Sequence, residues 1–301
     1  MSDERPTVRP VTLMRLVEVA HACRGESLPT TSIETALDVS HRRARETLLE
    51  AVRIDLLDEF EASEDEDERY QTTSIGESFL DAVMQENWKQ ASNILEKRSP
   101  HYGAFLETLE DSGTGTLDVL LDELEEGAEF TPYAYNQTSI EVIGDWAERL
   151  GAIQRNAFTG TYYTVATQTV PSNFHWVLLS VFDDLEETTG VGMRQRYLSI
   201  PELREHTCER LSLPRSVFDE ALVDLASENV GKLELSGAPV DTGAKDARLG
   251  VKSISLAEED GLVSTDQSTD QVMRGVEQYG KRYYYLAVHD RDLTFSTESS
   301  T

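Results

Sequence analysis

The sequence has 301 residues, of which 27 are Lys or Arg and 56 are Asp or Glu, so its formal net charge is −29. Hydrophobic residues make up 39% of the chain, and no apolar run reaches about 18 residues, so we expect no transmembrane helix. The polar N-terminus lacks the apolar segment of a secretory signal, and Cys23 and Cys208 lie far apart; we expect a cytoplasmic protein without a disulfide framework.

The basic residues divide into 21 Arg and 6 Lys, and abundant carboxylates with scarce lysine resemble the composition of halophilic archaeal proteins. An acidic surface keeps a protein soluble in concentrated salt and says little about its fold. At ~1 M salt the Debye length falls to roughly 3 Å, so repulsion from another polyanion is strongly screened. The negative net charge therefore leaves nucleic acid open as a partner.

The first part of the chain predicts helices followed by a hairpin. Apolar residues at helical spacing predict three helices, over 12–23, over 31–37 and from Ser40 to Val52. Ser40 is a natural N-cap for the third helix. Segments 56–61 and 69–73 predict a two-stranded hairpin around the acidic tip SEDEDE, and Ser74 is expected to cap a further helix.

This order of elements resembles the winged helix-turn-helix family. The residues that carry the resemblance are SIETALDVSHRRARETLLEAV followed by LLDEFEASEDEDERYQTTSIGESFL, and they cover about 12–83. The resemblance implies that the third helix is a recognition helix, whose N-terminal end reaches base edges of DNA. The acidic hairpin argues against a wing that enters a groove.

Similar patterns return further along the chain. Expected helices span 117–124, 139–150, 174–185, 200–211 and 214–227, with Pro214 in the first turn of the last. A hairpin is expected around Thr159 and Gly160, and the strand VGKLEL is expected to pair with YYYLAV.

The predicted fold is mostly α with small β-hairpins, arranged as tandem winged-helix modules. The predicted divisions are module 1 at 1–98, module 2 at 99–170, module 3 at 171–291 with a loop insertion at 236–271, and a disordered tail at 292–301.

No motif of a catalytic or cofactor-binding site occurs, so we expect a protein that is not an enzyme and holds no cofactor or metal. The pairs His21/Cys23 and His206/Cys208 share one spacing. Residues two apart on a helix point to nearly opposite sides, so neither pair chelates a metal from a helix.

Several other features are predicted to be structural. The GTGT run at 113–116 is expected to be a linker, and Tyr283 and Tyr285 are expected to share one face of a strand, with Tyr284 on the other. The tryptophans, each in an apolar helical pattern, are expected in the core or at an interface; they are Trp88, Trp146 and Trp176.

The third helix begins with an unusual group of cations. Arg42 points away from the core, Arg43 and Arg45 flank the two sides, and Arg53 also points away. Cations at a helix start oppose the helix dipole by about 0.3–1 kcal/mol each at low salt. An external anion removes this conflict, because forked guanidinium groups at a helix start bind phosphate well. A solvated face and contact with an acidic protein surface are the alternatives.

We therefore expect a non-enzymatic, double-stranded DNA-binding protein, either a regulator or the DNA-contacting subunit of a larger assembly. The alternative is a scaffold whose winged helices bind protein partners only, and a homodimer is open. The expected DNA contacts are Ser40, His41, Arg42, Arg43 and Arg45. Secondary backbone contacts are expected from the basic groups MRQRY and GKRYYY, at Arg194, Arg196, Lys281 and Arg282.

Overall fold

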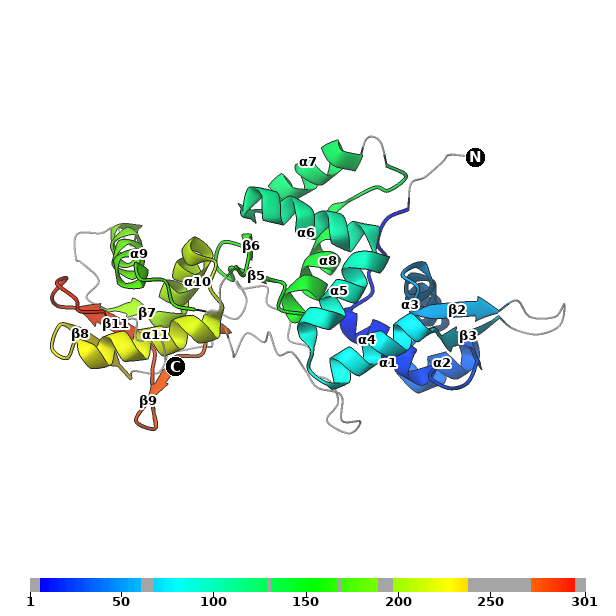
Figure 1. Cartoon of the computed structure of the whole chain (residues 1–301), viewed down its shortest axis with the longest axis horizontal. Coiled ribbons are helices and arrows are strands. Elements are labelled where there is room, and N and C mark those ends of the chain that lie inside the picture. The colour runs from blue at the N-terminus through cyan, green and yellow to red at the C-terminus, as the bar shows by residue number, and fades with distance from the viewer. Residues whose placement is uncertain are drawn as a thin grey trace. The chain divides into compact units, whose positions relative to one another are not determined.

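The computed structural model describes residues 6–60, 68–128, 131–166, 169–188, 197–237 and 272–295. These residues form eleven helices and several small antiparallel sheets, which confirms a mostly α fold with small β elements (Figure 1). The described chain divides into two compact units, up to Ile153 and from Gln154. This border falls inside the range predicted for module 2, and the three-module division stays a prediction.

The first unit begins with three helices and a hairpin. Its elements are α1 (Leu13–Ala22), β1 (Leu28–Pro29), α2 (Thr30–Leu37), α3 (His41–Arg53), β2 (Leu57–Phe60) and β3 (Arg69–Thr72). The strands lie in the order β1-β3-β2, with both pairings antiparallel. The predicted hairpin is therefore confirmed, while most of its acidic tip lies outside the described residues.

The remaining elements of this unit are α4 (Ser74–Met84), α5 (Trp88–Arg98), α6 (Pro100–Ser112), β4 (Thr114–Gly115), α7 (Leu117–Gly127) and α8 (Gln137–Arg149). Thr73 caps α4, one residue before the predicted Ser74, since its hydroxyl accepts the amide of Gly76. Helix α6 was not predicted, although Ser99 and Pro100 form a recognisable helix start. The prediction that the GTGT run is a linker is wrong, because this run contains β4.

The core of the first unit reaches from the chain start to α8. Trp146 is fully buried, as predicted, and its indole N–H donates to the carbonyl of Val11 at 2.9 Å. Asn136 and Ser139 form a capping box at the start of α8. The segment before α1 is thus fixed by hydrogen bonding as well as by apolar contact.

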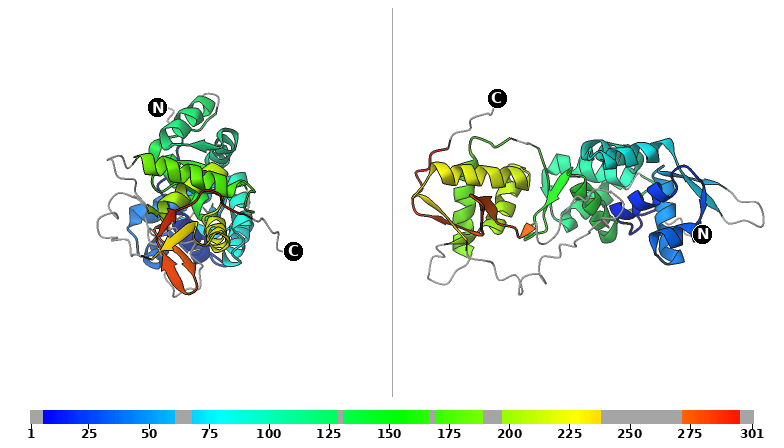
Figure 2. Two further views of the ribbon diagram at one scale, coloured as in Figure 1. Left: turned by 90° about the vertical axis from the view of Figure 1, so that its left-hand side faces the viewer. Right: turned by 90° about the horizontal axis from the view of Figure 1, so that it is seen from below.

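The second unit contains the elements β5 (Ile153–Arg155), which starts at the border, β6 (Tyr162–Thr164), α9 (Phe174–Thr188), β7 (Leu198–Ser199), α10 (Ile200–Leu211), α11 (Arg215–Glu228), β8 (Leu233–Ser236), β9 (Val276–Gln278), β10 (Lys281–Tyr283) and β11 (Tyr285–Val288). One sheet has the order β7-β11-β8, so the predicted pairing of VGKLEL with YYYLAV is confirmed. Strands β9 and β10 form a separate hairpin that projects from the helices of this unit (Figures 1 and 2).

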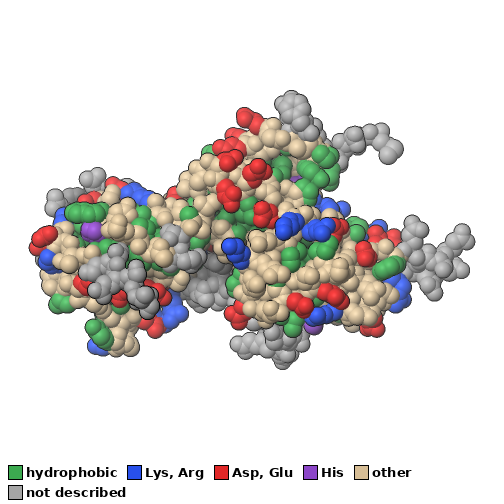
Figure 3. Space-filling model, viewed as in Figure 1, with side chains coloured by type: hydrophobic (Ala, Val, Ile, Leu, Met, Phe, Trp, Pro, Cys, Tyr) green, Lys and Arg blue, Asp and Glu red, His purple; other side chains and the backbone are tan. Residues whose placement is uncertain are grey.

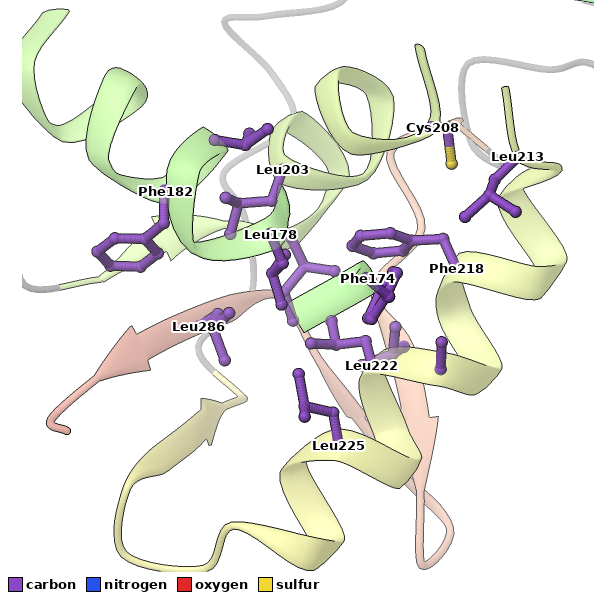
Figure 4. Close-up of a cluster of buried hydrophobic side chains, with 14 of the residues drawn as sticks. Phe174, Leu178, Phe182, Leu203, Cys208, Leu213, Phe218, Leu222, Leu225 and Leu286 are labelled. Atoms are coloured by element: carbon purple, nitrogen blue, oxygen red, sulfur yellow. The ribbon is translucent and has the colours of Figure 1, made fainter. Parts of the chain in front are cut away.

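Helices α9, α10 and α11 enclose the core of the second unit. Phe174 and Phe218 lie edge to face at its centre, with ring centroids 5.7 Å apart (Figure 4). Leu286 brings β11 into the same cluster. The three helices and the sheet therefore share one apolar interior.

Some predictions for the second unit are wrong in detail. Trp176 is 62% exposed, so it is not a core residue, and its place at an interface stays a prediction. Pro214 is the N-cap of α11 and not a first-turn residue. Tyr283 ends β10 and Tyr285 begins β11, so the tyrosines do not alternate along one strand. Most of the insertion and of the tail, 238–271 and 296–301, lies outside the described residues.

Candidate nucleic-acid interface

The start of α3 is open to its surroundings. Ser40 is the N-cap, with extended backbone angles φ −68° and ψ 153°, but its side chain makes no capping hydrogen bond. The prediction of the cap position is therefore confirmed, and the expected cap hydrogen bond is absent. Ser40, His41 and the first arginines are all exposed. Their polar groups can accept a partner from outside.

The arginines at this helix start differ in their contacts. Arg42 Nε donates to Glu46 Oε1 at 3.0 Å, although the Arg42 side chain is 87% exposed. Arg43 and Arg45 are exposed, and neither guanidinium group makes an ion pair or hydrogen bond with another described residue. His41 Nδ1 lies within hydrogen-bonding distance of Glu34 Oε1. Two guanidinium groups thus keep all their donors available.

The electrostatics of the helix start favour an anion. The first turn of α3 contains no acidic residue, and neither does the first turn of α1. Helix starts carry partial positive charge and unsatisfied amide N–H groups. Arginine adds to that charge, so the conflict inferred from the sequence is present in the structure.

The starts of α1 and α3 line a common cavity of about 540 Å³. Arg15, Arg42 and Arg43 are among its lining residues, with Glu46 as the one carboxylate among them. Arg15 is held in place, because it donates to Glu18 at 2.7 Å and to the carbonyl of Leu37 at 2.9 Å. Arg15 was not among the contacts predicted from the sequence, because it lines this cavity only through the packing of α1 against α3.

The opposite side of α3 carries a buried ionic network. Glu50 is fully buried and accepts from Arg53 Nε at 3.1 Å and from the amide of Arg9 at 3.3 Å. Arg53 also donates to His101 Nδ1 at 2.9 Å. The prediction that Arg53 points away from the core is therefore wrong, because two buried partners draw it inward.

His101 is the neutral member of this network. Its Nδ1 accepts from Arg53, which leaves the Nε2 hydrogen to donate to the carbonyl of Pro6 at 3.1 Å. Burial, and then the charge of Arg53, lower the pKa of His101. The network anchors the inner side of α3 and leaves the outer side free for contact.

The corresponding helices later in the chain lack free arginines. In α8, Arg149 donates to Asp145 at 2.9 Å. In α11, Arg215 donates to the buried carboxylate of Glu205 at 2.7 Å. Acidic side chains also gather over α6 and α7 on the face drawn in Figure 3. Among the described helix starts, that of α3 best suits a polyanion.

The secondary contacts are placed only in part. Arg194 and Arg196 lie outside the described residues. Lys281 and Arg282 are exposed on β10, and Arg282 Nε donates to Glu277 at 3.2 Å. They belong to the second unit, whereas α3 belongs to the first.

Among the described residues, no group of three or more His, Cys, Asp or Glu side chains could hold a metal ion. Burial raises the pKa of the Cys23 thiol to about 12, and burial also raises that of Cys208. The thiolate form that zinc requires is therefore disfavoured at both positions. In the described parts of the chain, no helix has the length and apolar character to cross a membrane.

Comparisons with known proteins leave the chain without a family. No protein-family model matches it, and no curated protein matches it. Among solved structures, it is similar to the magnesium ion-bound SspB crystal structure, with 13% sequence identity and a TM-score of 0.38. That similarity covers 78% of this chain and 81% of the other, and at these values it supports neither a fold family nor a function.

Proposed function

We propose that this chain binds double-stranded DNA through the start of α3, and that it does so as a non-enzymatic regulator or as the DNA-contacting subunit of an assembly. The proposal includes a fold assignment: tandem winged-helix modules. Its support is the order helix, strand, helix, helix, strand, strand, seen in α1 to β3 and again from α9 to β11 with β9 and β10 inserted. The sheet orders β1-β3-β2 and β7-β11-β8 follow the same scheme.

One observation carries the DNA proposal. Arg43 and Arg45 are exposed at a helix start and make no ion pair with a described carboxylate. This occurs in a chain in which 56 acidic residues outnumber 27 basic ones. The helix dipole opposes cations at this position. A phosphate or a base edge supplies the missing partner.

The geometry suits insertion into the major groove. In helix-turn-helix docking, the first residues of the second helix of the motif meet the bases. Arg42 and Arg43 are the expected contacts with base edges, since a guanidinium fork pairs with guanine acceptors. Ser40, His41 and Arg45 are the expected contacts with flanking phosphates, and the cavity beside Arg15 leaves room for one backbone phosphate.

A titration tests this function. Labelled mixed-sequence duplex DNA is titrated with the full chain over a range of KCl concentrations. The variant Arg43→Ala/Arg45→Ala is expected to bind at least about tenfold more weakly, and its salt dependence should be shallower by roughly one to two phosphate contacts. A pair of arginines already bound to carboxylates gives the matched control.

The control is Arg24→Ala/Arg98→Ala. It removes the same charge from the same unit, but Arg24 pairs with Asp81 and Arg98 pairs with Asp55. This control should bind DNA as the wild type does, apart from a small uniform loss. If the wild type binds no duplex in any KCl concentration, or if both double variants bind equally, the DNA function is wrong. A scaffold that binds only proteins then becomes the better explanation.

A further inference from the structure

The hairpin of β9 and β10 carries a feature that its fold does not explain. Gln278 pairs with Lys281, so Tyr279 and Gly280 form a two-residue turn. Their φ angles are +51° and +71°, and positive values at both positions are what a type I′ turn requires. Such turns favour Asn-Gly, because asparagine tolerates the left-handed region and a bulky aromatic residue does not. Tyr279 therefore strains the backbone at the tip.

The aromatic ring of Tyr279 gains nothing from the protein interior. The residue is 87% exposed, the most exposed large hydrophobic residue among those described. A strained and exposed aromatic residue lowers stability twice, through its backbone and through its contact with water. Strain of this kind persists where an external contact uses the residue.

The base of the hairpin is rigid. Val276 is buried, and Gln278 Nε2 donates to Ser227 Oγ on α11 at 2.7 Å. Gly275 packs so closely that a Cβ atom there would lie 2.0 Å from the carbonyl oxygen of Tyr283. The tip is thus held out from a fixed support (Figure 2), and a contact at the tip requires little ordering.

The charge around the tip is positive. The hairpin carries three cations, Arg274 at its foot and Lys281 and Arg282 near its tip, against one carboxylate, Glu277, which accepts from Arg282 at 3.2 Å and from Arg274 at 2.8 Å. Lys281 is exposed and has no ion pair with a described residue. In a chain with so large an acidic surplus, a basic hairpin tip favours a polyanion as its partner.

The foot of the hairpin has the opposite character. A cavity of about 420 Å³ there is lined by α11 and by the start of the hairpin, and its four carboxylates, Asp219, Glu220, Asp224 and Glu277, outnumber its one cation, Arg274. These groups would repel phosphates. Contact with a polyanion is therefore confined to the tip, at Tyr279 and Lys281.

We propose that the β9–β10 hairpin is a second DNA contact, in which Tyr279 packs against sugars and base edges in the minor groove while Lys281 binds a flanking phosphate. Apolar side chains are used as wedges in that groove, and a two-stranded tip is narrow enough to approach it. The inference rests on the proposed DNA function, but it concerns different residues in the other unit of the chain.

The test uses Tyr279→Asn in the full chain, titrated with the same labelled duplex in KCl. Asparagine fits the type I′ turn, so the melting temperature should stay unchanged or rise. The affinity for DNA should fall about fivefold or more, as expected for the loss of one aromatic contact with nucleic acid. Lys281→Gln should make the salt dependence shallower by about one phosphate contact.

Val230→Asn is the matched control. Val230 is 84% exposed in the same unit, and its replacement removes an exposed apolar group without touching the hairpin. It should bind DNA as the wild type does. If Arg43→Ala/Arg45→Ala weakens binding but Tyr279→Asn does not, the hairpin contact is wrong and the function of α3 stands.

Three other results would also overturn the hairpin contact. If Tyr279→Asn lowers the melting temperature, the tyrosine supports the fold. If it changes the sedimentation of the free protein and leaves DNA binding unchanged, the tip binds a second copy of the chain. If neither the α3 variant nor the hairpin variants change binding, the DNA function fails together with this inference.

Discussion

Helices α3 and α11 follow the same order of elements in their respective units, yet they use arginine in opposite ways. At the start of α3, Arg43 and Arg45 are exposed and have no ionic partner among the described residues. At the start of α11, Arg215 donates through Nε and Nη2 to the two oxygens of Glu205, at 2.7 and 2.8 Å. A third bond joins Arg215 to the carbonyl of Arg155 at 2.7 Å.

The difference shows that an arginine at a helix start is not by itself a nucleic-acid contact. Among the residues that the structure describes, each unit buries one glutamate completely, Glu50 in the first and Glu205 in the second. Glu50 binds Arg53 at the far end of α3, and so leaves the start of that helix free. Glu205 binds the arginine at the start of α11 itself. The position of the buried carboxylate decides which arginines remain available.

Removing the carboxylate of Glu205 should have the largest effect. Glu205→Gln leaves the charge of Arg215 without its carboxylate, while Arg204 keeps its pair with Asp219, and breaking a buried pair costs about 3–5 kcal/mol. We expect a loss of this size in urea denaturation, localised to the second unit by hydrogen exchange. Glu220→Gln, at an exposed position on α11, should change stability by less than about 0.5 kcal/mol. A loss below 1 kcal/mol for Glu205→Gln would show that Arg215 is not fixed by this pair.

Removing the charge of Glu50 in the first unit should lower the free energy of unfolding by less. Glu50→Gln removes the negative charge and one of the two oxygens that accept from Arg53 and Arg9, but the Arg9 side chain is 37% exposed and can be rehydrated. We expect a loss of about 2–3 kcal/mol, in the range for hydrogen bonds to charged groups and lower than for Glu205→Gln. Urea denaturation measures it. Because Glu50 lies on the inner side of α3, DNA affinity measured on the folded fraction should be unchanged. If Glu50→Gln lowers the DNA affinity of the folded protein, the binding surface is not the outer side of α3.

Through His101, the free energy of unfolding should depend on pH. Burial lowers the pKa of His101 in the folded state below its ordinary value of 6.5. Below pH 6.5 the unfolded chain therefore takes up a proton that the folded chain does not, and the free energy of unfolding falls with falling pH. His101→Gln keeps an acceptor for Arg53 and a donor for Pro6, so its stability should decline less between pH 7.5 and pH 5.5. Parallel pH profiles for wild type and variant would exclude His101 as the cause.

The sequence predicts the elements better than their inner contacts. Apolar spacing located α3, and it placed α10 at Ile200–Leu211 as observed. These predictions succeed because the apolar residues of a helix of that length recur at helical spacing within the local sequence. The pairing of β2 with β3 was predictable for a similar reason, since a charged turn separates two short apolar alternations.

The inner contacts depend on residues far away in the chain. Arg53 turns inward because His101 lies 48 positions later, and Glu50 can be buried because Arg9 lies 41 positions earlier. Nothing in the local pattern of α3 indicates either partner. The backbone strain at Tyr279 could not be predicted from the sequence either. It depends on the turn between β9 and β10, and the pairing of these strands was not predicted.

The smallest expected change in stability is that of Arg43→Ala, and it is the most direct test of the difference between the starts of α3 and α11. Arg43→Ala removes a cation from a dipole-positive helix start where it has no described partner, so it should raise stability by about 0.3–1 kcal/mol at low salt. Screening should remove most of that gain in ~1 M KCl. Arg215→Ala should do the reverse and lower stability in both conditions, because it leaves Glu205 buried without its main ionic partner. Urea denaturation at two salt concentrations measures both variants. If Arg43→Ala also lowers stability, then Arg43 contributes to the fold as Arg215 does, and the proposed distinction between the two helix starts is wrong.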